Sequence, residues 1–216
     1  EMTSSLVGSE MCIRDSTSIV LIIAGTLLLK ATEDISWLGA FFQSVSARTA
    51  GFSTYAIGDF TNAGLFVLCV LMFIGASPGS TGGGIKTSTF FVLFQAARSA
   101  CVKKNVCAFR RSISRQNISK ASMITVLSMM VVCVATFLLC VLEPDRTFIQ
   151  VFFEVVSAFG TVGLSTGITP GLSVAAKIVI IFVMFIGRLG AFTLLTIWIS
   201  HPEPKIRYSE ENIAIG

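Results

Sequence analysis

The stretch FIGASPGSTGGGIKT, residues 73–87, decides the fold of this chain. It follows an apolar run, residues 63–74, whose composition predicts a helix. At about 1.5 Å per residue, that helix is too short to cross a hydrocarbon layer of about 30 Å. The glycine-rich break therefore falls at membrane depth, where irregular backbone is tolerated only if it is buried in protein or lines a water-filled path. The stretch thus indicates a permeation route.

The composition also predicts an integral membrane protein. Hydrophobic residues make up 53% of the chain, charged residues only 13%, and the mean hydropathy is +0.82, whereas a soluble domain carries about 25% charged residues. The net charge of +4 reflects basic residues concentrated in one linker between apolar runs. The positive-inside rule explains that linker, so we exclude a nucleic-acid partner. The six cysteines form no CxxC pair and are expected to be reduced packing residues, without disulfide or metal.

The first half of the chain predicts a leader followed by one unit. Residues 1–16 resemble translated sequencing-adapter read-through rather than a signal peptide or a membrane span, so we expect a non-native leader and a native chain that starts earlier. The unit covers residues 17–100 and begins with a truncated outer helix. Its remaining elements are a short helix at 35–47, an extended segment at 48–54 and a broken inner helix at 61–100. The short helix can enter the bilayer but cannot cross it.

The second half predicts the same order of elements. The linker, residues 101–120, holds basic residues and no acidic residue, and is therefore expected in the cytoplasm, as is the polar tail at 201–216. The second unit covers residues 121–200. Its elements are an outer helix at 121–142, a short helix at 147–159 with Asp145 or Thr147 as N-cap, an extended segment at 160–166 and an inner helix at 174–200.

The two units are copies of each other. When the chain is shifted along itself so that TAGFST at 49–54 falls on TVGLST at 161–166, the same shift places MFIG at 72–75 on MFIG at 184–187 without a gap. Both units begin and end on the cytoplasmic side, so the repeat is parallel, around an axis along the membrane normal. Parallel copies around such an axis predict a pore.

The extended segments supply the chemistry of a cation filter. A short helix that ends in mid-membrane directs its negative C-terminal dipole at the centre, which favours a cation there. A TxGxST segment offers successive carbonyl groups, and its glycine permits them to converge on an axis. The alternative is that Gly51 and Gly163 are ordinary turn glycines after buried helices. The shared register of the flanking Thr and Ser residues weighs against that alternative.

Four motifs resemble a known family. SARTAGFST, GASPGSTGGGIKT, SAFGTVGLSTG and MFIGRLGAFTL closely resemble the third and fourth repeats of the Trk/Ktr/HKT potassium transporter superfamily, and the tail IRYSEENIAIG is similar to the end of KtrB-type subunits. The resemblance runs from about residue 17 to the end of the chain. Family members carry four units in one chain, so the resemblance implies an all-α membrane protein with two of four parallel outer-helix, pore-loop and inner-helix repeats.

The resemblance also implies the site residues. The third filter quarter corresponds to Thr49, Ala50, Gly51 and Phe52, and the fourth to Thr161, Val162, Gly163 and Leu164. Potassium at these carbonyl groups is the only metal expected. The gate below the filter corresponds to an intramembrane loop and a pore arginine: Gly75, Gly79, Ser80, Thr81, Gly82, Gly83, Gly84 and Arg188.

Charged residues near the filter have further expected roles. In an unbroken helix over 174–200, Arg188 would lie about 16 Å after Lys177 and about 20 Å before His201, at mid-membrane, where it should face water or a partner. The alternative is an arginine paired with loop carbonyls for structure alone. Ala191 departs from the family pattern, in which proline commonly follows GRLG. Lys86 is expected to cap the loop, and Arg48 and Glu154 to brace the filter from behind.

The expected function is potassium uptake by a multi-pass subunit of a bacterial cell membrane. The family implies a homodimer in lipid, seated on a cytosolic nucleotide-binding regulatory subunit of the KtrA/TrkA type. No cofactor is expected beyond transported K⁺, with Na⁺ or H⁺ as possible coupling ions. Enzyme functions are rejected, because Ile85 interrupts the phosphate-loop pattern in GSTGGGIKT and a single histidine, His201, cannot supply a haem or metal centre. The alternative function is a non-transporting, pore-like membrane domain.

Overall fold

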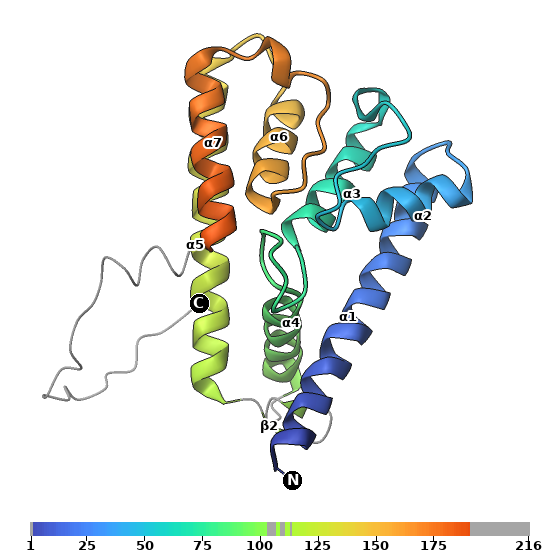
Figure 1. Ribbon diagram of the computed structural model, residues 1–216, viewed down its shortest axis with the longest axis vertical. Coiled ribbons are helices and arrows are strands. Elements are labelled where there is room, and N and C mark those ends of the chain that lie inside the picture. The colour runs from blue at the N-terminus through green and yellow to red at the C-terminus, as the bar shows by residue number, and fades with distance from the viewer. Residues whose placement is uncertain (1, 103–106, 109–110, 113, 191–216) are drawn as a thin grey trace, which may run out of the picture.

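The computed structural model describes residues 2–102, 107–108, 111–112 and 114–190, and it is α-helical except for one small hairpin (Figure 1). The helices are α1 (Met2–Thr32), α2 (Trp37–Ser46), α3 (Asn62–Phe73), α4 (Thr87–Val102), α5 (Arg115–Leu142), α6 (Phe148–Gly160) and α7 (Val174–Leu189). Two short 3₁₀ turns, η1 (Ile57–Asp59) and η2 (Thr169–Gly171), precede α3 and α7. Strands β1 (Cys107–Ala108) and β2 (Arg111–Ser112) pair antiparallel between α4 and α5.

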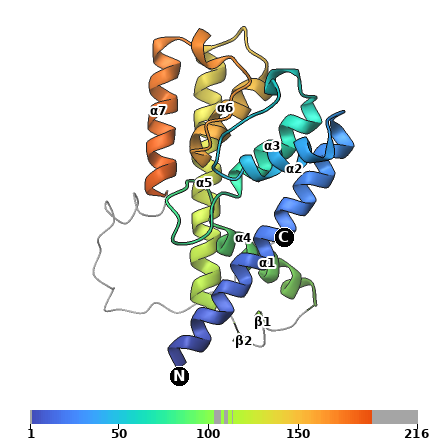
Figure 2. The same ribbon diagram turned by 45° about the vertical axis from the view of Figure 1, so that its right-hand side comes forward.

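The two predicted units are present as two similar sets of helices. In each set a long outer helix (α1 or α5) is followed by a short helix (α2 or α6) and then by an inner helix (α3 or α7), as Figures 1 and 2 show. Both outer helices contain an apolar stretch of membrane-crossing length, Met11–Thr32 and Arg115–Leu142. The turns η1 and η2 are related by the same shift that superposes the two TxGxST segments.

Side-chain caps fix where the short and inner helices begin. Ser36 Oγ accepts the Gly39 N–H at 3.0 Å at the start of α2. Thr147 and Gln150 form a capping box at the start of α6, in which the Thr147 N–H donates to Gln150 Oε1 at 3.3 Å. This confirms Thr147, rather than Asp145, as the N-cap.

The predicted break in the first inner helix is confirmed. Helix α3 ends at Phe73, and α4 begins only at Thr87. Between them Ile74 and Ile85 form an isolated parallel bridge, so the two ends of the loop lie side by side. Residues 74–86, here called the intramembrane loop, lie beneath the end of α6 in both ribbon views (Figures 1 and 2).

Three predicted boundaries differ from the structure. Helix α5 begins at Arg115 rather than at residue 121, because Ser114 caps it by accepting the Asn117 N–H at 3.3 Å. Helix α7 ends at Leu189, where Gly190 takes a left-handed φ of 84°, so the prediction of a helix over 174–200 is wrong at residue 190. Residues 191–200 and the tail at 201–216 lie outside the described residues. Helix α1 runs from Met2 through the segment predicted to be a leader.

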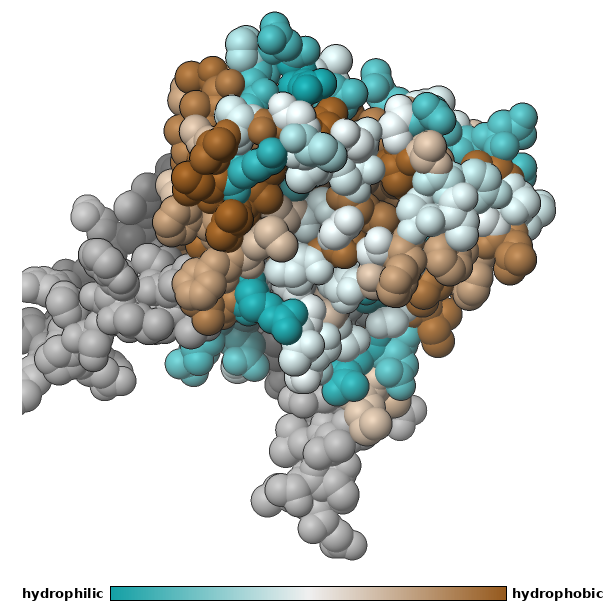
Figure 3. Space-filling view, turned by 45° about the horizontal axis from the view of Figure 1, so that its top comes forward, coloured by the Kyte–Doolittle hydropathy of each residue, from teal (hydrophilic) through white to brown (hydrophobic). Residues whose placement is uncertain are grey.

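Helix α6 forms the centre of the core. Nine of its residues are buried, among them Phe153 and Phe159, and it packs between α3, α5 and α7. By contrast, Phe137 of α5 is 68% exposed on the outside, as expected for a lipid-facing position. In Figure 3, pale residues of intermediate hydropathy run down the middle of one face between hydrophobic flanks. The buried helix α6 leads into the second extended segment, in which Val162, Leu164 and Thr166 are buried, whereas Phe52, Ser53 and Thr54 of the first segment are exposed.

Candidate functional site

The two TxGxST segments have the same unusual backbone. Thr49 and Thr161 have left-handed φ angles of 70° and 51°, and they are the only non-glycine residues with positive φ among the residues described. Gly51 and Gly163 follow two positions later with φ angles of 78° and 94°. A left-handed β-branched residue is uncommon and costs free energy. Because the left-handed residues recur at equivalent positions, the two units share a backbone conformation as well as a sequence motif.

Each segment is held by the short helix that precedes it. The Ser46 hydroxyl donates to the Phe52 carbonyl, and the Ser157 hydroxyl donates to the Leu164 carbonyl at 2.6 Å. The carbonyl groups of Phe52 and Leu164 thus each accept one hydrogen bond from a serine of the preceding short helix. The gap-free shift does not superpose these two serines, because the second repeat has an extra residue between its serine and its left-handed threonine.

The next position of each segment is also braced from behind. In the first repeat Gln43 Nε2 donates to Ser53 Oγ at 2.7 Å. In the second, Glu154 accepts a hydrogen bond from the hydroxyl of Ser165 and another from the Thr166 N–H at 3.0 Å. Glu154 thus contacts the second extended segment from α6, as predicted, and its role at a filter stays a prediction. Sequence reasoning missed Gln43. It occupies the position equivalent to Glu154 only when the repeats are aligned with a one-residue gap for the extra residue of the second repeat.

The two segments meet each other in space. A Cβ atom added to Gly51 would lie 1.9 Å from the Val162 carbonyl oxygen, so only glycine allows this approach. Val162 is buried, whereas Phe52 is 71% exposed. The structure therefore brings the predicted third and fourth quarters into direct contact through Gly51 and Val162.

The intramembrane loop lies against both left-handed threonines. The Gly83 N–H donates to Thr161 Oγ1 at 2.9 Å, and a Cβ atom on Gly82 would lie 2.9 Å from Thr49 Oγ1. Gly75, at the root of the loop, is buried. The tip residues predicted for the gate, Gly79, Ser80 and Thr81, are exposed, and a Cβ atom on Gly79 would meet nothing within 4 Å among the described atoms.

Two cationic side chains anchor the loop. Lys86 Nζ donates to the carbonyl groups of Gly82, at 2.5 Å, and Ser80, at 3.2 Å, which confirms the prediction that Lys86 caps the loop. Arg48 was predicted to brace the filter, but its guanidinium donates to the Gly75 carbonyl at 3.3 Å and to the Ser18 carbonyl at 3.2 Å. Arg48 therefore ties the loop root to α1.

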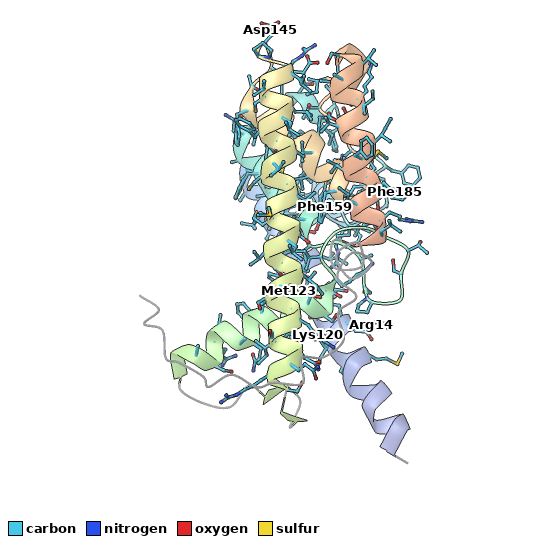
Figure 4. All side chains as sticks on the ribbon, turned by 90° about the vertical axis from the view of Figure 1, so that its left-hand side faces the viewer. Arg14, Lys120, Met123, Asp145, Phe159 and Phe185 are labelled. Atoms are coloured by element: carbon cyan, nitrogen blue, oxygen red, sulfur yellow. The ribbon has the colours of Figure 1, made fainter. Side chains whose placement is uncertain are left out.

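Arg188 lies in the last turn of α7 and is exposed. Its charge is close enough to Lys86 for the two cations to repel each other. Among the residues that the structure describes, Arg188 donates no hydrogen bond to a loop carbonyl, so the structural pairing alternative gains no support. Arg188 lies within α7, so its distance from the start of the helix remains as predicted. Because α7 ends at Leu189, the predicted distance from Arg188 to His201 cannot be counted along this helix. Figure 4 shows the neighbouring Phe185 pointing outward from α7.

The outer ends of the two repeats share another contact that sequence reasoning missed. The N-cap residue of α3, Thr61, donates its N–H to Glu33 Oε1 at 2.9 Å. The N-cap residue of α7, Ser173, donates its N–H to Glu143 Oε1 at 2.6 Å. This hydrogen bond lowers the pKa of the half-buried Glu143 carboxyl. A carboxylate at the end of each outer helix thus fixes the start of each inner helix.

Comparison with known proteins identifies the family. The family model of the cation transport protein TrkH matches residues 12–209. This chain belongs to the TrkH family of cation transport proteins. As a TrkH family member it is a membrane protein with a channel-like helical fold, and the family comprises cation transporters rather than enzymes.

Individual relatives agree with this assignment. Ktr system potassium uptake protein B of Vibrio alginolyticus is 45% identical over 83% of this chain and 40% of its own length. Ktr system potassium uptake protein D of Bacillus subtilis is 41% identical over 87% of this chain and 42% of its own length. The crystal structure of the potassium transporter TrkH from Vibrio parahaemolyticus aligns with a TM-score of 0.69 and 25% identity, over 88% of this chain and 44% of that one. The chain thus spans less than half the length of these relatives.

Proposed function

We propose that this chain forms the last two of four repeats in a potassium-conducting subunit. The observation that carries the proposal is the repeated left-handed backbone at Thr49 and Gly51 and at Thr161 and Gly163, with the two segments in contact at Gly51 and Val162. Two copies of a strained segment packed against each other fit a ring better than unrelated turns. The relatives named as potassium uptake proteins support potassium as the ion.

Backbone carbonyl groups would bind the ion. Because Phe52 and Leu164 accept hydrogen bonds from the short helices, we assign ion binding chiefly to the carbonyl groups of residues 49–51 and 161–163. Helices α2 and α6 end just before these residues, so their negative dipole ends add to the attraction for a cation. A ring of such carbonyl groups replaces the hydration shell of the ion.

The intramembrane loop would act as the gate. It lies against Thr49 and Thr161, and its glycines allow a closer approach to these residues than a side chain would permit. Lys86 and Arg188 place two positive charges beside it, which opposes the passage of a cation while the loop is in place. Opening requires the loop to leave Thr161, with Arg48 and Lys86 holding its two ends.

The assembly expected from the family completes the proposal. The linker at 101–120 and the C-terminal tail would face the cytoplasm of a bacterial cell, where a nucleotide-binding regulatory subunit would dock on a homodimer. In Figure 4, Asp145 lies at one end of the molecule and Lys120 and Arg14 lie towards the other, in agreement with a basic cytoplasmic side. Transport could be coupled to Na⁺ or to H⁺, or be channel-like.

Potassium-dependent growth tests the proposal. The complete four-repeat protein should restore growth of uptake-deficient cells at low potassium, and Gly163→Asp should abolish that growth, because an aspartate side chain does not fit a left-handed filter position with φ of 94°. Absence of rescue by a protein that reaches the membrane, with no effect of Gly163→Asp, would favour the non-transporting, pore-like domain.

A further inference from the structure

The two short helices brace equivalent positions with chemically different side chains. Ser53 and Ser165 occupy the same place in their TxGxST segments. The neutral amide of Gln43 donates to Ser53, whereas the carboxyl group of Glu154 accepts from Ser165. The first repeat thus shows that an amide can hold this position, and the second repeat uses an acid instead.

Glu154 is buried among hydrogen-bond donors. The side chain is buried, with 5% of its surface exposed. Its Oε1 atom accepts the Thr166 N–H at 3.0 Å, and its Oε2 atom accepts the Thr169 hydroxyl at 2.9 Å, in addition to the contact with Ser165. A backbone N–H can only donate, so Glu154 Oε1 serves as an acceptor in this contact.

The charge of Glu154 lacks a cationic partner within the described part of the chain. Its hydrogen-bond partners are hydroxyl groups and one backbone N–H, all of them uncharged. A buried charge without a counter-ion is costly, and its field is weakly screened. Ser165 is only two residues after Gly163, so backbone dimensions place the carboxylate about 10 Å or less from the Gly163 carbonyl.

We propose that the Glu154 carboxylate supplies the fixed negative charge that retains a monovalent cation in the filter. Glu154 is a positioning residue, because it acts through its field and through Ser165 rather than by coordinating the ion. The inference rests on the proposed function and deepens it. It also predicts that the second repeat, rather than the first, sets the affinity for the ion, since Gln43 is neutral.

The test is the potassium dependence of uptake by the complete four-repeat protein and its variants. Glu154→Gln copies the side chain of the first repeat and removes the charge. Its amide oxygen can still accept the Thr166 N–H, and the Thr169 hydroxyl can rotate to accept from its NH2 group, so KM should rise about five- to tenfold while Vmax stays within about twofold. Glu154→Asp retains the charge and should keep KM within about twofold of the parent value. Asp145→Asn removes the same charge from an exposed turn and should leave KM unchanged.

Three results would overturn the inference. They are an unchanged KM in an active Glu154→Gln variant, an equal loss of Vmax in Glu154→Gln and Glu154→Asp at unchanged KM, and a Glu154→Gln variant that fails to accumulate in the membrane. The last two results would assign the carboxylate a purely structural role. If the parent protein itself shows no uptake, the proposed function fails, whereas an active parent with an unaffected Glu154→Gln variant overturns this inference alone.

Discussion

The two inner helices, α3 and α7, begin alike and then differ after a sequence that they share. Both start at a capped residue held by a glutamate, and both run into the sequence MFIG. Helix α3 then ends at Phe73, whereas α7 continues to Leu189. After the shared MFIG, the first repeat continues with ASPGSTGGG and the second with RLG. Proline and glycine disfavour a continuing helix, so the break follows from the residues after MFIG.

The equivalent glycines of the two MFIG sequences, Gly75 and Gly187, make different contacts. A Cβ atom on Gly75 would lie 2.0 Å from the Gly83 carbonyl oxygen, within the loop itself. A Cβ atom on Gly187 would lie 2.0 Å from the Phe159 carbonyl oxygen, at the end of α6. Glycine thus permits loop closure in the first repeat and helix packing in the second. The comparison teaches that one repeat supplies a glycine-rich loop at this level and the other a continuous helix that carries Arg188.

The largest effect is expected at the contact between the two segments. Gly51→Ala places a methyl group 1.9 Å from the Val162 carbonyl oxygen and requires a left-handed alanine, so it should reduce potassium uptake at least about a hundredfold. Isotope uptake into cells with matched amounts of membrane protein measures this. Gly171→Ala is the control, because its methyl group would meet only the end of the Arg146 side chain. Near-normal uptake by Gly51→Ala would contradict a functional role for the contact between the two segments.

The positive charge of Arg188 on α7 has the next largest expected effect. Arg188→Ala removes one of two neighbouring cations beside the loop, so uptake should rise about tenfold. Arg188→Lys keeps the charge and should retain the parent rate. Equal rates in Arg188→Ala and Arg188→Lys would show that charge at this position does not oppose conduction.

A smaller effect is expected at the hydrogen bond that joins the intramembrane loop to Thr161. Thr161→Val removes the acceptor of the Gly83 N–H but keeps the shape of the side chain. A hydrogen bond contributes about 1 kcal/mol net, so the loop should leave the filter about fivefold more often, and basal uptake should rise accordingly. Thr161→Ser keeps the acceptor. Indistinguishable basal uptake in the two variants would contradict a restraining role for this bond.

The smallest effect is expected at the outer end, where the two repeats are most alike. The Ser173 N–H lowers the pKa of Glu143, so the ionised carboxylate stabilises the fold at neutral pH. That contribution is present above the unfolded-state pKa of about 4.3 and is lost as the pH falls through the lower folded-state value. Glu143→Gln should therefore lower the Tm of the purified protein slightly at pH 7, and the difference should vanish below that range. An identical difference at pH 7 and pH 3 would refute the linkage.

Sequence reasoning predicted the features that depend on local pattern. The internal repeat, the break after Phe73 and the contact of Lys86 with loop carbonyls are all encoded in short motifs. Glycine spacing, helix length and the charge of a loop end suffice for these features. The membrane class likewise follows from composition alone.

The remaining features depend on three-dimensional reach. Gln43 and Glu154 do not superpose under the shift that aligns the TxGxST segments, because the second repeat is longer between its short helix and its left-handed threonine. A gap-free repeat therefore hides their equivalence. It also hides that of the carboxylates Glu33 and Glu143, because the second repeat has a further extra residue between its carboxylate and its short helix. Arg48 is long enough to reach several acceptors, and only the folded backbone shows which carbonyl groups it binds.

Deletion of residues 77–83 tests the central claim most directly. The pairing of Ile74 with Ile85 and the proximity of Gly75 to Gly84 allow the shortened loop to close without moving α3 or α4. If the loop is the gate of a potassium filter, the complete protein lacking these residues should take up potassium faster than the parent. An uptake rate equal to or below that of the parent, at equal membrane abundance, would contradict the account.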